Sequence, residues 1–461
     1  MTKEDAGRIL AAQKAWFRQG HTLPYAFRME QLGRLYDAVR RYEGKIAAAL
    51  QADLGKCAAE SYMSETGMVL AGISHIRKHL KGWMRPKREP SPMTVFPSSG
   101  RVEYTPKGSV LIIGPYNYPF QLAMEPLAEA LAAGNCAVIS PSELTPSVSA
   151  VLEELVAETF DGAYVRCVPG GVEANTALLA CRFDAIFFTG SPRVGKIVME
   201  AAAKNLVPVT LELGGKSPVI VDETARLDAA CRRIVWGKLL NAGQTCVAPD
   251  YVLVHRRVFQ PFIKGLTEAI RAFYGEDSRQ SSDYGRIVNR RHMERLTGML
   301  TRDKAFIRFG GRWDGEARYI EPTILCPDSF AAACMQEEIF GPLLPVFPYD
   351  RLEEALDRIN GGETPLALYI FSEDKGTVET ILGRTASGGV CVNDTVSHLI
   401  HPGLPFGGLG ESGMGHYHGE AGFRTFSHAR SVLRRSTRVV VNLAFPPYGE
   451  KKLRAIKRFM K

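Results

Sequence analysis

Between residues 110 and 213, short apolar runs alternate with segments of helical periodicity. The apolar runs are Val110–Ile113, Ala137–Ile139, Tyr164–Val168, Ala185–Phe188 and Val209–Leu213, and the helical segments are Glu125–Ala133, Ser147–Glu158, Ala174–Leu179 and Gly195–Lys204. This alternation predicts a parallel sheet with helices on both faces, which is a doubly wound α/β fold. Because ligands bind such folds at the carboxyl ends of the strands, the residues that follow each apolar run are candidates for a site.

Size and composition predict a soluble protein. The chain has 461 residues, 45% of them hydrophobic and 23% charged, which corresponds to two or three domains. Its nine cysteines form no C-x-x-C pair and no zinc-like cluster, so we expect neither a disulfide framework nor a bound metal. The N-terminus lacks an apolar signal core, and no apolar run approaches the roughly 18 residues that span a bilayer. We therefore expect a cytoplasmic location.

The net charge of +8 is concentrated at the C-terminus. Residues 451–461 hold six basic residues and no acidic one, so the rest of the chain carries +2. A nearly neutral body is not typical of a nucleic-acid-binding protein. One helical face of this tail would carry Leu453, Ile456, Phe459 and Met460. Weak contact with an anionic membrane surface, a subunit contact and a simple basic terminus all remain open.

Two glycine motifs resemble nucleotide-binding motifs, but only the first is predicted to contact a nucleotide. Gly190-Ser-Pro-Arg-Val-Gly-Lys196 follows an apolar run and resembles a P-loop, but Ile197 stands where magnesium ligation needs Ser or Thr. We expect no nucleotide hydrolysis there, although a helix opening after Gly190 and Ser191 would suit a pyrophosphate. The G-x-G-x-x-G match at 408–413 follows no strand and opens no βαβ unit, so it predicts a tight loop.

Three side chains are candidates for catalysis. Cys246 lies among small polar residues, and a helix starting near it would lower the pKa of its thiol. Glu212 ends an apolar run, where burial would raise its pKa towards the range of a general base. Asn117 lies on a proline-stiffened turn after the first run, where its amide could donate to an oxyanion. The alternatives are a buried apolar cysteine, a solvated strand end and an ordinary turn asparagine.

Taken together, the segments from about Tyr25 to Ser427 resemble the aldehyde dehydrogenase superfamily. Six motifs occur in that family's order: Pro115-Tyr-Asn-Tyr-Pro119, Phe188-Thr-Gly-Ser191, Leu211-Glu-Leu-Gly-Gly215, Gly243-Gln-Thr-Cys246, Glu337-Glu-Ile-Phe-Gly-Pro342 and Leu404-Pro-Phe-Gly-Gly408. The segments Cys246-Val-Ala-Pro-Asp-Tyr251 and Phe445-Pro-Pro-Tyr448 are similar to the class 3, fatty-aldehyde-type branch.

The resemblance implies a role for each matching residue. It makes Cys246 the nucleophile, Glu212 the base that activates water, and Asn117, together with the Cys246 backbone N–H, the oxyanion hole. It places Gly190 and Ser191 against the pyrophosphate of a bound NAD(P). It also implies that Glu338 contacts the nicotinamide ribose and that Phe340 packs near the nicotinamide ring.

One position departs from the family pattern. The family usually has Lys-Pro-Ser-Glu, in which the lysine touches the adenosine ribose, whereas this chain reads Ser140-Pro-Ser-Glu143. Without that cation, and with Glu143 close by, a 2′-phosphate should bind less well. We therefore expect NAD to be preferred over NADP, with NADP still possible.

The implied reaction is NAD(P)-dependent oxidation of an aldehyde to the carboxylic acid through a thiohemiacetal and a thioester on Cys246. The class resemblance suggests medium or long aliphatic or aromatic aldehydes. Two alternatives remain open at this point. One is a CoA-acylating aldehyde reductase, which Glu212 disfavours because it offers a base for water. The other is a non-catalytic binding protein on the same fold.

The resemblance also implies a domain organisation. Residues 1–84 and 102–214, with part of 395–430, would form the cofactor-binding domain, and residues 215–394 the catalytic domain. Residues 85–101 and 431–445 would bridge subunits, since the strand-like stretches Arg101–Thr105 and Ser431–Asn442 are suited to an interface. Residues 446–461 would form the basic tail. Members of this branch suggest a homodimer.

Overall fold

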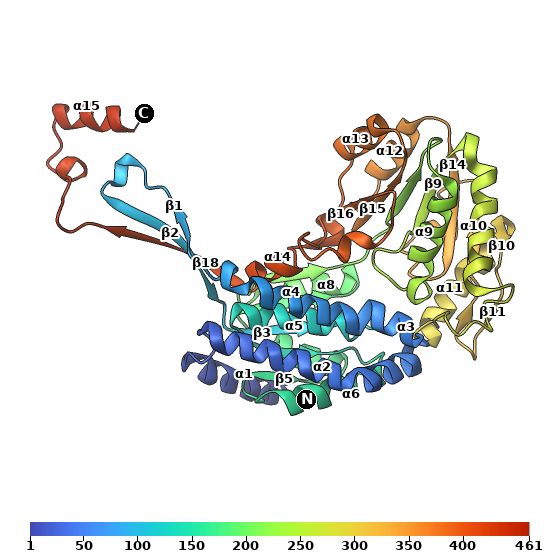
Figure 1. Cartoon of the computed structure of the whole chain (residues 1–461), viewed down its shortest axis with the longest axis horizontal. Helices are drawn as coiled ribbons and strands as arrows, with labels where there is room; N and C mark the ends of the chain where they lie inside the picture. Colours follow the sequence, from blue (N-terminus) through green and yellow to red (C-terminus); the bar gives the residue numbers. More distant parts are fainter. Residues whose placement is uncertain (461) are drawn as a thin grey trace.

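The computed structural model describes residues 1–460 and consists of two α/β bodies and a projecting arm (Figure 1). One body is built on a six-stranded sheet of order β17-β7-β6-β3-β4-β5, and the other on a seven-stranded sheet of order β10-β13-β14-β9-β8-β15-β16. The arm contains the three-stranded sheet β1-β2-β18. The α/β fold class expected from the sequence is confirmed.

The six-stranded sheet contains the five strands expected from the apolar runs. They are β3 (Ser109–Ile113), β4 (Cys136–Ser140), β5 (Val165–Cys167), β6 (Ala185–Thr189) and β7 (Val209–Glu212). All five run parallel, and β17 (Gly413–Met414) joins the β7 edge antiparallel. The carboxyl ends of the parallel strands therefore meet along one edge of the sheet.

Helices cover both faces of this sheet because successive strand residues point in opposite directions. Val110 and Ile112 pack with one set of helices: α2 (Tyr25–Leu54), α4 (Gly67–Trp83), α5 (Gln121–Ala133) and α6 (Pro146–Thr159). Leu111 and Ile113 belong to a second core, formed with α1 (Lys3–Arg18), α7 (Val172–Leu179) and α8 (Pro192–Ala203). The short helix α3 (Ala58–Ser61) and a π-helical turn, Tyr62–Thr66, lead into α4.

The second body continues directly from the first. Its strands are β8 (Pro218–Val221), β9 (Tyr251–His255), β10 (Ile307–Phe309), β13 (Thr323–Leu325), β14 (Leu343–Tyr349), β15 (Ala367–Phe371) and β16 (Gly389–Val392). All pairs are parallel except β10 with β13. The helices are α9 (Leu227–Leu239), α10 (Phe259–Tyr274), α11 (Arg290–Arg302), α12 (Leu352–Asn360) and α13 (Lys375–Arg384), and a small hairpin pairs β11 (Trp313–Asp314) with β12 (Tyr319–Ile320).

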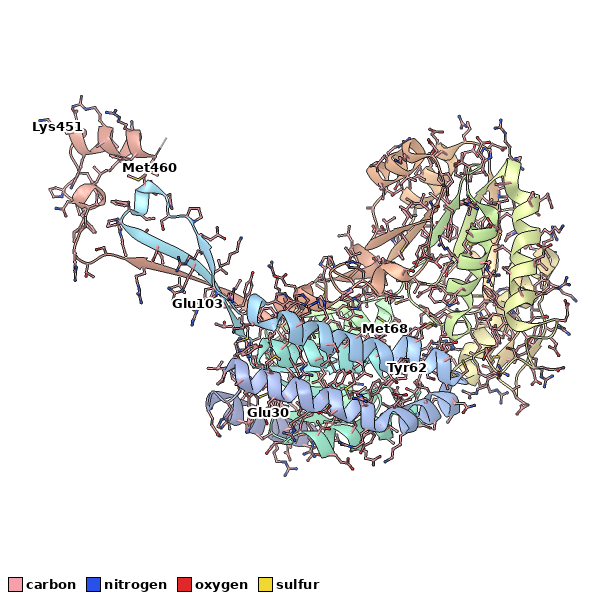
Figure 2. All side chains as sticks on the ribbon, in the orientation of Figure 1. Glu30, Tyr62, Met68, Glu103, Lys451 and Met460 are labelled. Carbon is pink, nitrogen blue, oxygen red and sulfur yellow. The ribbon has the colours of Figure 1, made fainter. Side chains whose placement is uncertain are left out.

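The arm extends away from both bodies, with Glu103 near its base and the C-terminal helix at its end (Figure 2). It contains β1 (Lys87–Glu89), β2 (Ser98–Pro106) and β18 (Ser427–Arg435), and β18 follows α14 (Gly419–Thr425). The expected strand at Ser431–Asn442 was wrong over its second half. The Ser436 N–H still donates to the Pro97 carbonyl, but residues 436–460 form no strand, so Val439–Val441 lie outside the sheet.

The tail forms helix α15 (Glu450–Phe459), whose side chains are mostly exposed. The last residue of the predicted tail, Lys461, lies outside the described residues. Among residues 1–460, no helix has both the length and the apolar character needed to cross a bilayer.

Candidate functional site

Four of the candidate residues lie at the carboxyl edge of the six-stranded sheet. In the register, Ile113 pairs with Ser140 and Thr189 pairs with Glu212. Asn117 follows β3, Ser140 ends β4, Gly190 follows β6 and Glu212 ends β7. Parallel pairing therefore brings together polar residues that lie up to 95 positions apart in the sequence, at the edge where ligands of doubly wound folds bind.

Cys246 comes to this edge from the second body. It lies in a turn after α9 and a short 3-10 segment, Leu240–Gly243. Asn241 and Ala242 have φ values of 53° and 52°, and Gly243 has 78°. These left-handed conformations are uncommon for non-glycine residues, so the surrounding contacts must hold the turn.

Two hydrogen bonds join the cysteine turn to the loop after β3. The Asn241 side-chain N–H donates to the Asn117 carbonyl oxygen at 2.7 Å. The Tyr118 hydroxyl lies 2.5 Å from the Thr245 hydroxyl. The structure therefore brings Asn117 and Cys246 together. The Asn117 side-chain amide makes no hydrogen bond to any residue between 1 and 460, so it is available to a ligand.

The expectation for the Cys246 thiol was wrong in one respect. No helix starts at Cys246, so no helix N-terminus lowers its pKa. Burial instead raises the pKa of Cys246 to about 12, and the carboxylates of Glu338 and Glu212 add to the rise. At neutral pH the thiol is therefore protonated, and it ionises only where its surroundings become more polar or more positive.

Glu212 is 3% exposed, and neither of its carboxylate oxygens has a hydrogen-bond partner among the described residues. Burial raises the pKa of Glu212 well above its usual value, as expected from the sequence. Its charge reaches Cys246, so the two side chains share one site. Unpaired buried carboxylates are costly and are found mainly where they have a function.

A buried ion pair that the sequence analysis missed holds the loop with Asn117. The Lys56 ammonium lies 2.6 Å from a Glu65 carboxylate oxygen, and both side chains are fully buried. Lys56 also donates to the Asn117 carbonyl at 3.0 Å, and Glu65 accepts from the backbone N–H groups of Phe120 and Gln121. The pair therefore fixes the backbone on both sides of the loop. The sequence signals this pair only by two charges, one between α2 and α3 and one in the π-helical turn before α4.

Glu338 and Phe340 lie on a loop that two other residues hold in place. Arg295 donates to the carbonyls of Glu338 and Ile339 at 3.1 and 2.7 Å. Lys216 donates to Asp250, whose other oxygen accepts from the Ile339 N–H. These supports have no signal in the sequence, because the partners are distant in the chain.

The same loop brings a carboxylate against the end of β7. The Glu338 carboxylate lies over Gly214, where any Cβ would overlap it. Burial and the nearby Asp250 raise the pKa of Glu338 to about 8. Phe340 has a φ of 45°, and its ring lies 5.9 Å from that of Tyr116. The charges of Glu338 and Glu212 both act on Cys246, so the three side chains lie close to one another.

The residues expected at a dinucleotide also lie at the strand ends. Ser191 caps α8, with its hydroxyl accepting from the Val194 N–H, and Gly190 donates its N–H to the Glu212 carbonyl. The Ser140 hydroxyl is buried without a partner among the described residues, and exposed Glu143 packs on Gly171. An open helix N-terminus and an unpaired hydroxyl fit a dinucleotide laid across this edge.

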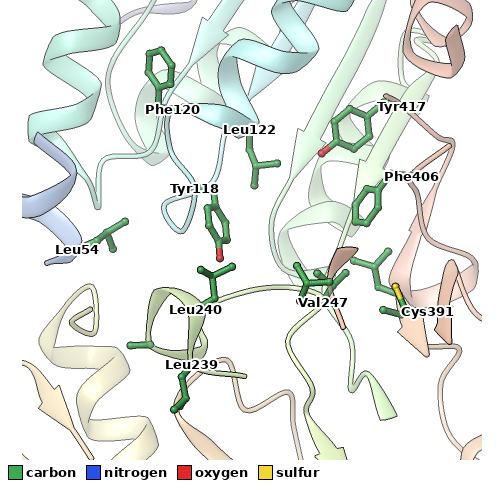
Figure 3. Packing of buried hydrophobic residues seen from close by; sticks show 14 of the residues in the cluster. Leu54, Tyr118, Phe120, Leu122, Leu239, Leu240, Val247, Cys391, Phe406 and Tyr417 are labelled. Carbon is green, nitrogen blue, oxygen red and sulfur yellow. The ribbon is translucent and has the colours of Figure 1, made fainter. Parts of the chain in front are cut away.

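A pocket of about 70 Å³ leads to Cys246. Figure 3 shows Tyr118 and Leu122 on one side and Phe406 and Tyr417 on the other. Val247, which follows Cys246 in the chain, lies below them in this view. The remaining lining residues are mostly apolar: Met63, Met68, Trp236, Leu240, Val396, Leu399 and Ile400, with Ser64, Gln121, Thr245 and His418. Cys246 is thus partly exposed and reachable by an apolar substrate.

The G-x-G-x-x-G segment has the structural role predicted for it. It forms a 3-10 turn, Gly410–Ser412, followed by β17, which pairs with β7. The Leu213 N–H donates to the Ser412 carbonyl, so this loop supports Glu212 instead of binding phosphate. Among residues 1–460, no group of three or more His, Cys, Asp or Glu side chains is arranged to hold a metal ion.

Known proteins resemble this chain over most of its length. Residues 1–432 match the model of the aldehyde dehydrogenase family. The chain is 50% identical to 4,4'-diaponeurosporen-aldehyde dehydrogenase of Staphylococcus aureus (strain NCTC 8325 / PS 47), covering 97% of each chain. It is 45% identical to the dimeric NADP-preferring aldehyde dehydrogenase of Rattus norvegicus, covering 91% of this chain and 92% of the relative.

A solved structure of Staphylococcus aureus AldH in its substrate-bound state superposes with a TM-score of 0.97, at 49% identity and 99% coverage of both chains. The expected fold class, the class 3 resemblance and the NAD(P)-dependent chemistry are thereby confirmed, and a non-catalytic protein is disfavoured. The chain belongs to the aldehyde dehydrogenase family and oxidises aldehydes with NAD(P) as cofactor.

Proposed function

We propose that Cys246 is the nucleophile, Glu212 the base for hydrolysis, and Asn117 with the Cys246 backbone N–H the oxyanion hole. The observation that carries this proposal is the unpaired, buried Glu212 carboxylate beside a cysteine that opens onto an apolar pocket. No other described cysteine lines that pocket.

The reaction uses these groups in sequence. The Cys246 sulfur attacks the aldehyde carbon after the thiol loses its proton, and the aldehyde oxygen becomes an oxyanion held by two N–H donors. Loss of hydride from this adduct leaves a thioester on Cys246. Glu212 then removes a proton from water, the hydroxide attacks the thioester carbon, and the carbon–sulfur bond breaks to give the carboxylic acid and the thiolate.

The hydride acceptor is NAD(P), which supplies the redox chemistry when bound. We propose that Gly190 and Ser191 hold its pyrophosphate at the start of α8. Glu338 binds the nicotinamide ribose, and Phe340 packs against the ring. The support is the N-terminus of α8 and the closeness of the Glu338 and Glu212 carboxylates to Cys246.

Ser140 and Glu143 set the cofactor preference in this proposal. The lysine that would attract a 2′-phosphate is replaced by Ser140, and Glu143 places a carboxylate close to the same strand end. We therefore propose that NAD is preferred, although the rat relative is named NADP-preferring. Parallel titrations that gave a lower KM for NADP than for NAD would reverse this assignment.

Two variants test the catalytic assignment. Cys246→Ala removes the nucleophile and should abolish NADH formation with any aldehyde. Glu212→Gln should still release one equivalent of NADH in a burst but turn over at least 100-fold more slowly, because deacylation lacks its base. Undiminished steady-state turnover in either variant would contradict the assignment. Added CoA should not accelerate turnover, and a requirement for CoA would instead indicate a CoA-acylating reaction.

We propose that the substrates are medium or long aliphatic, or aromatic, aldehydes. The support is the apolar lining contributed by α4, α9 and the loop at 396–400. The Staphylococcus aureus relative is named for 4,4'-diaponeurosporen-aldehyde. A panel from acetaldehyde to decanal and benzaldehyde should show kcat/KM rising with apolar size, as buried area increases.

The division into domains is also a proposal. Residues 1–84 and 102–214, with part of 395–430, form the cofactor-binding domain, and 215–394 the catalytic domain. The segments 85–101 and 431–445 bridge subunits of a homodimer, because the β2 and β18 arm projects from the body. Sedimentation of the full chain should give twice the monomer mass, and removal of residues 85–101 should abolish the dimer.

The location and the tail complete the proposal. We propose a cytoplasmic enzyme whose tail touches anionic lipid weakly, since exposed Leu453 and Phe459 on α15, and Met460 after it, accompany the basic residues of the same helix. A chain that ends at residue 450 should lose binding to vesicles containing phosphatidylserine. Equal binding by both chains would leave the tail with no role at membranes.

A further inference from the structure

One wall of the aldehyde pocket is polar, although the rest is largely apolar. The wall comes from Gln121 and Glu125 on α5 and from His418, just before α14. Gln121 and His418 line the pocket directly. The proposed chemistry at Cys246 uses none of these three side chains.

The three side chains form one buried group. Gln121 donates to a Glu125 carboxylate oxygen, and the other Glu125 oxygen lies 3.6 Å from His418 Nε2. Their exposures are 6%, 7% and 4%. His418 Nε2 has no hydrogen-bond partner among the described residues. Because buried polar atoms are nearly always hydrogen-bonded, this nitrogen points to a ligand group in the pocket.

The backbone holds the His418 ring against this pocket. His418 has a φ of 76°, a strained conformation for a residue with a side chain. Tyr417 exchanges two backbone hydrogen bonds with Phe406, at 3.0 and 2.7 Å. The His418 ring then stacks on Phe406 with centroids 5.3 Å apart. Strain retained in a buried, well-supported residue is typical of functional positions.

Acidic side chains predominate around the pocket. No Lys or Arg is present among the lining residues, and Glu125, Glu129 and Glu212 all act on the lining residue Tyr417. Lys56 stacks on the Tyr118 ring, but it is already paired with Glu65. An anionic group on a substrate would therefore meet carboxylates without a free cation to offset them.

We propose that Glu125 and His418 select the aldehyde by the polar group on its chain. They bind a hydroxyl group on an otherwise apolar, neutral aldehyde, and they reject an aldehyde that carries a carboxylate. The hydroxyl accepts from the His418 ring N–H, and the Glu125 carboxylate lies behind His418 and Gln121. This inference rests on the proposed function, because it assigns the substrate class of the same pocket.

Three aldehyde series test the proposal with the full-length enzyme and NAD. They are the unbranched alkanals, the ω-hydroxyalkanals and the ω-oxoalkanoates, each with six, eight and ten carbons. In a purely apolar pocket the hydroxyl would lose its hydrogen bonds to water and lower kcat/KM at every length. We expect one length at which the hydroxyalkanal equals or exceeds the alkanal. We expect the oxoalkanoates to be at least tenfold poorer at every length.

Two variants separate the roles of the wall. His418→Phe keeps a ring on Phe406 and should lower kcat/KM about tenfold more for the best hydroxyalkanal than for the matching alkanal, as for loss of one buried hydrogen bond. Glu125→Gln keeps the shape and should raise kcat/KM for the oxoalkanoates about tenfold. His398→Phe is the matched control, since His398 also packs on Phe406, at 5.9 Å, but does not line the pocket.

Hydroxyalkanals that are poorer than alkanals at all three lengths would overturn the proposal. An equal loss of kcat/KM for the hydroxyalkanals in His418→Phe and His398→Phe would also overturn it. The same holds if kcat/KM for the oxoalkanoates is unchanged in Glu125→Gln. Should His418→Phe fail to fold, Glu125→Gln and the wild-type series still decide. Failure of the proposed function looks different, because the Cys246→Ala enzyme would then still oxidise alkanals.

Discussion

The buried pair of Lys56 and Glu65 offers a sharp test of how this site is held. Both side chains are fully buried, and the Lys56 ammonium lies 2.6 Å from a Glu65 carboxylate oxygen. The pair makes three further hydrogen bonds to the backbone of the loop around Asn117. Lys56→Met removes one partner and leaves Glu65 uncompensated. Breaking a buried pair in this way costs about 3–5 kcal/mol. At roughly 2 °C per kcal/mol for a large cooperative unit, the melting temperature should fall by about 6–10 °C.

The loss should depend on pH with a defined sign. Burial already raises the pKa of Glu65, and Lys56 is the main group that opposes this rise. Without Lys56 the folded-state pKa rises further above the unfolded value. A carboxyl with a raised pKa stabilises the fold fully below the unfolded pKa, and this contribution is lost as the pH rises towards the folded pKa. The difference between Lys56→Met and wild type should therefore grow from pH 5 to pH 8.

Differential scanning fluorimetry at pH 5, 6, 7 and 8 measures both effects. Lys56→Met combined with Glu65→Gln is the control, because it leaves no charge behind and should be less destabilised than the single variant at pH 8. A pH-independent change of less than 2 °C for Lys56→Met would refute the reasoning. kcat should also fall in Lys56→Met, since the Asn117 carbonyl loses a donor.

Three further outcomes are expected. Alkylation of Cys246 by iodoacetamide in the cofactor-free protein should keep accelerating above pH 9, because burial and neighbouring acids raise its pKa to about 12; a plateau by pH 8 would contradict this. Gly422→Ala should lower the melting temperature by several degrees, since its Cβ would overlap the Glu129 carboxyl, whereas exposed Gly383→Ala should not. Ser140→Lys should lower the KM for NADP at least tenfold relative to NAD, and an unchanged ratio would remove Ser140 from the specificity argument.

The sequence alone determined the sheet and the residues along its edge. Apolar runs with alternating residues buried on two faces can form only a covered parallel sheet, and Val110 and Leu111 indeed enter different cores. Parallel strands place their carboxyl ends together, so Asn117, Glu212 and Gly190 meet whatever the details of packing. The expected positions needed only local periodicity and strand direction.

Only the tertiary structure decided how Cys246 is presented. The left-handed turn at Asn241 and Ala242 is unfavourable locally and is stabilised by a bond to Asn117, 124 residues away. The pKa of the thiol depends on burial and on Glu338, 92 positions along the chain. The sequence pattern predicted that this pKa would be lowered, whereas the structure raises it. Local periodicity carries no information on such contacts, because burial and charge are set by neighbours that only folding brings together.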